Sequence, residues 1–136
     1  YGSDDAGKIE SDYALLRLAE IYYYLAEIRF HQGKKSEAEK LLNYVRKRYY
    51  PAGSSSLYPE DGSVLTEQEL LDEWGREFLG EGLRRQTLCR FGVYNSGTWW
   101  DKEPDEDNHT MLVPLSRTAL NTNPNLKQYP GYPSVD

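Results

Sequence analysis

Polar side chains recur at steps of three and four residues between positions 13 and 31, and they leave a narrow polar stripe on an otherwise apolar segment. This spacing is typical of one face of an α-helix. Because apolar residues occupy nearly all the rest of the circumference, we expect most of this helix to be buried, and we expect it to end at Gly33. The polar stripe consists of Arg17, Glu20, Tyr24, Glu27 and His31.

A second helix is predicted directly after Gly33. Ser36 and Glu39 have the Ser-x-x-Glu spacing of a capping box, which marks a helix start. Ala26 in the first helix and Ala38 in the second are small enough to let the two backbones approach. We therefore expect an antiparallel pair over residues 13–50. The apolar face of the second helix is formed by Ala38, Leu41, Leu42, Val45 and Tyr49.

This helix pair has the length and pattern of one tetratricopeptide-type repeat of about 34 residues. A single pair cannot bury both of its faces, so we expect further helices to pack on it, some of them outside this chain. The positions typical of such a repeat are Tyr22, Leu25, Ala26, Gly33, Ala38, Leu42 and Val45.

The rest of the chain divides into a loop, a helical segment and a tail. Residues 51–65 carry Pro, Gly and a run of Ser, which predicts a loop. Thr66 and Glu69 repeat the capping-box spacing and open a helical segment over 66–91, which Gly80 and Gly82 interrupt.

Five of the seven prolines lie in the tail, residues 92–136. The predicted fold is all-α: a tetratricopeptide-like helix pair, a further helical segment, and an irregular Pro-rich tail. We expect this tail to pack on the helical body through Leu112, Val113, Leu115, Leu126 and the tyrosines.

Composition and charge narrow the function classes. The 136 residues include 12 Tyr, 3 Trp and 3 Phe, so aromatic rings supply much of the core. The formal net charge is −6 and the isoelectric point is near 5.0, which disfavours a protein that binds the nucleic-acid backbone. Cys89 is the single cysteine, so an internal disulfide and a cysteine zinc cluster are excluded. No run of about 18 apolar residues is present.

The residues that could support catalysis or metal binding are better explained by structural roles. His31 and His109 lack spaced partners, and Cys89 follows a leucine in a helical segment. The acidic run from Asp101 to Asn108 lacks the spacing of a calcium loop, and the acidic residues 69–81 lie among arginines that can neutralise them. We therefore predict no catalytic residue, no metal site and no cofactor. A small glycan hydrolase that uses Glu77 or Glu81 is a minor alternative.

Two adjacent tryptophans in a Gly- and Ser-containing loop are the strongest candidates for ligand contact. Aromatic rings stack on the apolar faces of sugars, and amide groups hydrogen-bond the hydroxyls. Adjacent residues of an extended segment point in opposite directions, so one tryptophan can be exposed while the other is buried. The predicted ligand-binding residues are Tyr94, Asn95, Trp99 and Trp100; anchoring of the tail is the competing role.

The order of short motifs along the chain resembles the C-terminal part of the SusD/RagB family of bacterial nutrient-binding lipoproteins. The resemblance runs from Asp12 to Tyr132. Its motifs are Asp12-Tyr13, Arg17 to Tyr22, Ala26-Glu27, Leu42-Asn43, Val45 to Arg48, Arg76-Glu77-Phe78, Glu81-Gly82, Arg84, Leu88, Arg90-Phe91-Gly92, Asn123 to Leu126, Gln128, and Pro130 to Tyr132.

The resemblance implies non-catalytic capture of a glycan or other nutrient at the bacterial cell surface. The implied partner is a SusC-like TonB-dependent transporter of the outer membrane. Members of the family are several times longer, and this chain begins with Tyr1. We therefore expect it to be the C-terminal portion of a SusD/RagB-like helical domain, lipid-anchored through a residue upstream. The resemblance also implies that Arg17, Glu20, Glu81 and Arg84 join helices by ion pairs.

A second hypothesis needs no family resemblance. The helix pair by itself is typical of a tetratricopeptide-like scaffold that binds a peptide or protein partner and has no carbohydrate role.

Overall fold

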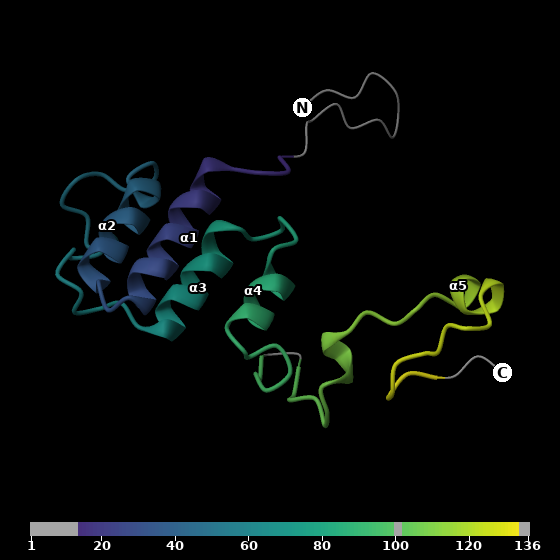
Figure 1. Cartoon of the computed structure of the whole chain (residues 1–136). Coiled ribbons are helices and arrows are strands. Elements are labelled where there is room, and N and C mark those ends of the chain that lie inside the picture. Colours follow the sequence, from purple (N-terminus) through teal and green to yellow (C-terminus); the bar gives the residue numbers. More distant parts are fainter. Residues whose placement is uncertain (1–13, 100–101, 134–136) are drawn as a thin grey trace, which may run out of the picture. The chain divides into compact units, whose positions relative to one another are not determined.

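The computed structural model describes residues 14–99 and 102–133, and within these ranges the secondary structure is helical (Figure 1). The chain divides into two compact units, residues 1–70 and 71–136. The helix α3 runs across their boundary. The predicted all-α fold is confirmed. Its elements are α1 (Leu18–His31), α2 (Lys35–Arg46), α3 (Glu67–Glu77), α4 (Arg84–Arg90), a 3-10 turn (His109–Met111) and α5 (Arg117–Thr122).

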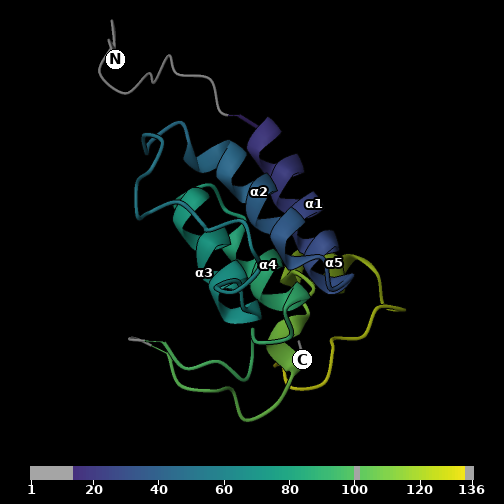
Figure 2. The same cartoon turned by 90° about the vertical axis from the view of Figure 1, so that its left-hand side faces the viewer.

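The helices α1 and α2 form an antiparallel hairpin in the first unit, as predicted. They lie side by side in two perpendicular views (Figures 1 and 2). Ala26 and Ala38 are both fully buried, so the small side chains do permit a close approach of the two backbones. Gly33 has a φ of 76° in the connecting turn, a conformation that glycine adopts without steric cost. The match to a tetratricopeptide repeat itself stays a prediction.

The prediction about which face of α1 is buried is wrong. Glu20 and Glu27, which belong to the predicted polar stripe, are only 8% and 7% exposed. The apolar residues of the opposite face are exposed by 41% to 70%. Ala19, Tyr23 and Ala26 are buried with the two glutamates, and α1 packs against α2. Small side chains favour this face because they let the two backbones approach closely. The exposed residues Leu18, Ile21, Leu25 and Ile28 form one row along the helix, called here the α1 seam.

The predicted capping box of the second helix is also wrong. The helix α2 begins at Lys35, so Ser36 lies inside its first turn, and the N-cap residue Lys34 makes no side-chain capping bond. Glu39 is fully buried and points to the following loop instead. Its carboxylate accepts hydrogen bonds from the backbone N–H groups of Gly62, at 2.8 Å, and Leu65, at 3.2 Å. The carboxylate therefore holds the loop against α2.

The loop over 51–65 is irregular, as predicted, and one buried amide fixes it to α2. The Asn43 amide nitrogen donates to the Tyr58 carbonyl at 2.9 Å, and the Asn43 amide oxygen accepts from the Tyr58 N–H at 3.0 Å. The Tyr58 hydroxyl then donates to Glu69 at 2.8 Å. At the start of α3, the Thr66 hydroxyl accepts from the Glu69 N–H at 3.1 Å, which is the predicted cap.

In the second unit, α3 ends in a glycine-containing turn that leads to α4. The rings of Trp74 and Phe78 pack 5.0 Å apart on the last turns of α3. Arg84, at the start of α4, donates to the carbonyl oxygen of Leu71 at 2.9 Å. The family resemblance implied an ion pair for Arg84, but among the described residues its hydrogen-bond partner is this neutral carbonyl group.

The tail contains regular structure that the sequence analysis did not predict. Ser116 caps α5 by accepting from the Ala119 N–H at 3.2 Å, and residues 109–111 form a 3-10 turn. The Gln128 amide forms a two-way pair with the backbone of Leu115. Leu112, Val113 and Leu126, which were expected to anchor the tail, are exposed by 38% to 70%. Packing of its apolar residues on the helices stays a prediction.

Candidate ligand-binding site

The structure places two of the four predicted ligand-binding residues around one hollow in the second unit. The hollow has a volume of about 220 Å³. Tyr94 and Trp99 supply aromatic walls, and α4 supplies the remaining apolar wall. The lining residues are Arg84, Leu88, Tyr94, Trp99 and Lys102.

Trp99 is held in a short turn. Its N–H donates to the carbonyl of Lys102 at 2.9 Å, and the Lys102 N–H donates back at 3.2 Å, which makes one antiparallel bridge. A Cβ atom at Gly97 would lie 2.3 Å from the Trp99 ring, so only glycine leaves room for the indole at this place. The Lys102 ammonium lies 5.8 Å from the ring centroid. Trp99 is half-buried and keeps part of its ring at the hollow.

Tyr94 stands beside the basic residue Arg85 of α4. The Arg85 guanidinium lies 5.0 Å from the Tyr94 ring centroid, within the range of a cation–π contact. The same guanidinium donates to the carbonyl oxygens of Thr110 and Met111, at 3.2 and 2.9 Å. Arg85 therefore joins α4, the Tyr94 ring and the 3-10 turn of the tail.

Asn95 is buried and anchors a later part of the tail, residues 107–110. Its amide nitrogen donates to the Asp107 carbonyl at 3.0 Å and to the Thr110 hydroxyl at 2.8 Å. Its amide oxygen is enclosed and has no hydrogen-bond partner in the described part of the chain. Neither end of the amide reaches the hollow in this conformation. Trp100, the fourth predicted residue, lies outside the described residues.

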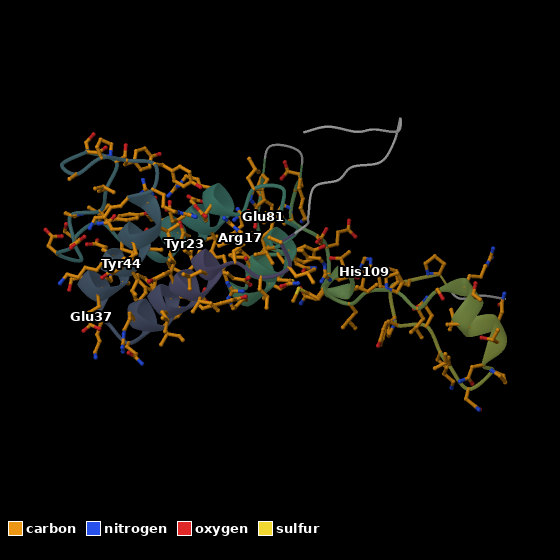
Figure 3. All side chains as sticks on the ribbon, turned by 90° about the horizontal axis from the view of Figure 1, so that it is seen from above. Arg17, Tyr23, Glu37, Tyr44, Glu81 and His109 are labelled. Atoms are coloured by element: carbon orange, nitrogen blue, oxygen red, sulfur yellow. The ribbon has the colours of Figure 1, made fainter. Side chains whose placement is uncertain are left out.

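The loop that follows the hollow is stabilised by hydrogen bonds to carboxylates. The pKa of Asp107 lies below its ordinary value, chiefly because the backbone N–H of His109 donates to the carboxylate, and the His109 ring adds to the effect. His109, labelled in Figure 3, also packs edge-on against Tyr132, with 4.9 Å between ring centroids. Thr110 donates to Asp105 at 3.0 Å. These contacts stabilise residues 105–110, the segment to which the Asn95 amide is hydrogen-bonded.

Three residues of the hollow are absent from the predicted set. Arg84 and Leu88 are four residues apart on α4, so they lie on one face of that helix. This spacing is the feature of the sequence that could have indicated a binding face. The same spacing also occurs on helix faces that only pack against a neighbour, and the turn that brings Trp99 to α4 is not evident from the sequence. Lys102 reaches the hollow through its bridge to Trp99.

The other candidate chemistries concern metal ligands, carboxylates and membrane-spanning helices. Within 14–99 and 102–133, no three His, Cys, Asp or Glu side chains gather closely enough to hold a metal ion. Of the acidic residues near α3, Glu73 pairs with Arg76 at 2.8 Å. In the same ranges, none of the helices is both long enough and apolar enough to cross a membrane. A second hollow of about 490 Å³ lies at the turn between α3 and α4.

Comparison with known proteins decides the family. The sequence profile of the SusD family matches residues 2–132. The chain belongs to the SusD family. It is 35% identical, over 130 aligned residues, to the starch-binding protein SusD of Bacteroides thetaiotaomicron. That alignment covers 90% of this chain and 22% of the relative, so this SusD-family chain spans about a fifth of the length of the curated protein that it matches.

Proposed function

We propose that this chain is the C-terminal portion of a non-catalytic glycan-binding protein that delivers its ligand to a SusC-like TonB-dependent transporter. The observation that carries the proposal is the family match over 2–132, together with 35% identity to a protein named for starch binding. In this proposal residues 13–50 form a tetratricopeptide-like pair, 66–91 a helical segment and 92–136 the tail. The intact protein is lipid-anchored at the outer-membrane surface through a residue upstream of the chain.

The aromatic hollow is the proposed point of glycan contact within this chain. Trp99 and Tyr94 provide ring faces and edges, and Lys102 and Arg84 provide hydrogen-bond donors. Such a combination of apolar walls with a few polar groups is typical of sites that bind small ligands. Of the carboxylates of α3, Glu73 pairs with Arg76 at 2.8 Å and does not line the hollow.

The test compares Trp99→Ala with the parent chain in calorimetric titrations with maltoheptaose and with a panel of acidic oligosaccharides. We expect the affinity for the glycan that binds to fall at least about fivefold, because a stacking aromatic ring contributes about 1–3 kcal/mol when a ring face is covered. Tyr129→Ala is the matched control, since Tyr129 is 40% exposed in the tail and does not line the hollow. Binding that survives Trp99→Ala unchanged would remove the hollow from the proposal.

Absence of catalysis is measured in the same samples. After prolonged incubation we expect no new reducing ends in any glycan that binds. New reducing ends that disappear in Glu77→Gln would favour the hydrolase alternative instead.

The second candidate function is a scaffold that binds a protein partner. The α1 seam favours it, because four large apolar side chains of one helix face are exposed. This function predicts that Ile21→Gln together with Ile28→Gln abolishes partner capture, whereas Trp99→Ala leaves capture intact.

A further inference from the structure

The hollow is basic although the chain as a whole is acidic. The formal net charge is −6, yet the two charged residues that line the hollow, Arg84 and Lys102, are both cations. Arg85 lies against the wall residue Tyr94 and adds a third positive charge. Such a concentration of one sign in a concave site attracts ligands of the opposite sign.

The two arginines of this site have neutral partners. Within the described residues, Arg84 donates to the Leu71 carbonyl, and Arg85 donates to the carbonyls of Thr110 and Met111. Other basic residues of the described chain do pair with carboxylates, as Arg29 does with Glu37 at 3.2 Å and Arg76 with Glu73 at 2.8 Å. Lys102 belongs to this second group, because it lies 3.2 Å from Asp105. The excess positive charge of the site therefore resides on the arginines.

Arg84 is the arginine that a ligand can use. It is half-buried, and it lines both this hollow and the larger one at the turn between α3 and α4. A guanidinium has five N–H donors in a planar fork. The bond to Leu71 uses the Nη1 atom, and the guanidinium lies against Gly75 of α3, so the Nη2 atom is the donor left to bind a carboxylate or sulfate. Partial burial strengthens such an ion pair, because the site is less screened than open water.

The walls of the hollow indicate what carries the anion. Leu88 is buried, and Tyr94 and Trp99 are half-buried, so a ligand meets apolar surface beside the cation. A free inorganic anion gains nothing from such surface, whereas the apolar face of a sugar ring does. Resting on the proposed function, we propose that this hollow selects an acidic sugar unit, with a carboxylate or sulfate on Arg84 and the ring against Trp99.

The experiment uses the full 136-residue chain and a matched pair of ligands. Trigalacturonate and its fully methyl-esterified form share one backbone and differ in charge. A sulfated disaccharide and sodium sulfate alone complete the series, so that a carboxylated sugar, a sulfated sugar and a free anion are distinguished. Calorimetric titration gives each dissociation constant at low and at high salt.

Three variants separate charge from structure. Arg84→Gln removes the proposed anion contact, and Arg84→Lys keeps the charge but loses the fork. Arg117→Gln removes one exposed cation of α5, in the same unit, and is the control. Circular dichroism verifies that each variant keeps its helices.

We expect the acidic trisaccharide or the sulfated disaccharide to bind at least about tenfold more tightly than the methyl ester, and to lose affinity as salt increases. Arg84→Gln should remove that preference, Arg84→Lys should restore part of it, and Arg117→Gln should leave it unchanged.

If the ester or maltoheptaose binds as tightly as the acidic sugars and Arg84→Gln changes nothing, the inference fails while the proposed function stands. If sodium sulfate alone binds as tightly as the sugars, the site is an anion site and the inference fails. If no glycan binds, both proposals fail for this chain.

Discussion

At the scale of single residues, several backbone groups of the loops form hydrogen bonds with side chains instead of with other backbone groups. Asn43 pairs with the backbone of Tyr58, and Gln128 pairs in the same two-way manner with the backbone of Leu115. Glu39 and Asn95 receive or supply hydrogen bonds for other loop segments. Because unpaired buried polar groups are costly, irregular segments can be ordered only where such side chains satisfy them.

The buried Glu39 carboxylate gives the sharpest stability prediction. In Glu39→Gln, one acceptor becomes an NH₂ group that faces a backbone N–H of Gly62 or Leu65. We expect the free energy of unfolding in urea to fall by about 2 kcal/mol. Glu37→Gln on the same helix is the control (Glu37 is labelled in Figure 3). We expect it to cost less than about 1 kcal/mol, because the ion pair of Glu37 with Arg29 is exposed. Equal losses in the two variants would contradict the role of Glu39.

Gly97 gives a prediction that links the backbone to the hollow. A methyl group there would lie 2.3 Å from one Trp99 ring carbon and 2.8 Å from the Val93 carbonyl oxygen. Gly97→Ala must therefore displace the indole, at a cost of about 1–3 kcal/mol in thermal unfolding, and it should weaken glycan binding with it. Ser96→Ala, the exposed neighbour, serves as the control. Full glycan affinity in Gly97→Ala would show that the indole position does not matter for binding.

Glu60 makes the stability of the first unit depend on pH. Its pKa lies below the ordinary value of 4.5, chiefly because the Asn43 amide donates to the carboxylate at 2.9 Å, with Lys47 contributing. The unfolded chain takes up the proton first as pH falls, so the stabilisation is complete above about pH 4.5 and is lost as pH falls through the folded pKa.

The measurement is the free energy of unfolding of the parent and of Glu60→Gln between about pH 3 and about pH 6. We expect the parent to lose more stability than the variant on acidification, so that the two curves converge at the acid end. Parallel curves over the whole range would show that the Asn43 contact does not favour the charged form of Glu60.

At the scale of elements, the positions of the helices were predictable and their faces were not. Regular spacing and glycine punctuation located four helices to within a few residues, except at the start of α1, which was expected at 13 and begins at Leu18. The short α5 was missed because a six-residue helix carries too little periodicity, although Ser116 provides its cap. The spacing of apolar residues predicts that a segment is helical more reliably than it predicts which elements that helix packs against.

The two errors in the hairpin have one cause. The sequence predicts exposed positions for Glu20 and Glu27 and a capping role for Glu39, because acidic side chains rarely lie in a core. In the structure all three are buried, and Glu39 is satisfied by backbone N–H groups that belong to a loop more than 20 residues away. A long-range partner of this kind leaves no trace in the periodicity of the helix itself.

The candidate site was predictable in the same partial way. Tyr94 and Trp99 do line one hollow, but the Asn95 amide is turned toward residues 107–110, and the cations Arg84 and Lys102 are not in the predicted set. Aromatic residues in a glycine-containing loop can be recognised from sequence. Their basic neighbours depend on how the loop folds back on α4, which the sequence pattern does not specify.

The two faces of α1 give a direct comparison between burial and hydrophobicity. Tyr23 is fully buried, whereas Ile21 is 52% exposed on the α1 seam. We expect Tyr23→Ala to lower the free energy of unfolding by about 3 kcal/mol or more, because it leaves a cavity. Ile21→Ala should change it by less than about 1 kcal/mol, since alanine favours the helix and little burial is lost. Urea unfolding measures both, and a large loss in Ile21→Ala would place the seam in the core.

At the scale of the whole molecule, one continuous row of exposed apolar side chains lies along the first helix. The residues of the α1 seam are spaced by three, four and three positions, which places them on one face. A row of this kind is typical of a surface that another element or molecule covers. It agrees with the proposal that the chain is the C-terminal portion of a longer SusD-family protein, since the alignment covers only 22% of the starch-binding relative.

The α1 seam predicts how the isolated chain behaves in solution. With the seam exposed to water, we expect the chain to self-associate reversibly, so that its weight-average mass in sedimentation equilibrium increases with concentration above 15.7 kDa. Ile21→Gln combined with Ile28→Gln should keep the mass at the monomer value and leave helicity unchanged, because both side chains are at least 50% exposed. Leu126→Gln, in the tail, should behave as the parent does. A parent chain that stays monomeric at every concentration would show that the seam drives no association, and would remove this support for a covering segment in the intact protein.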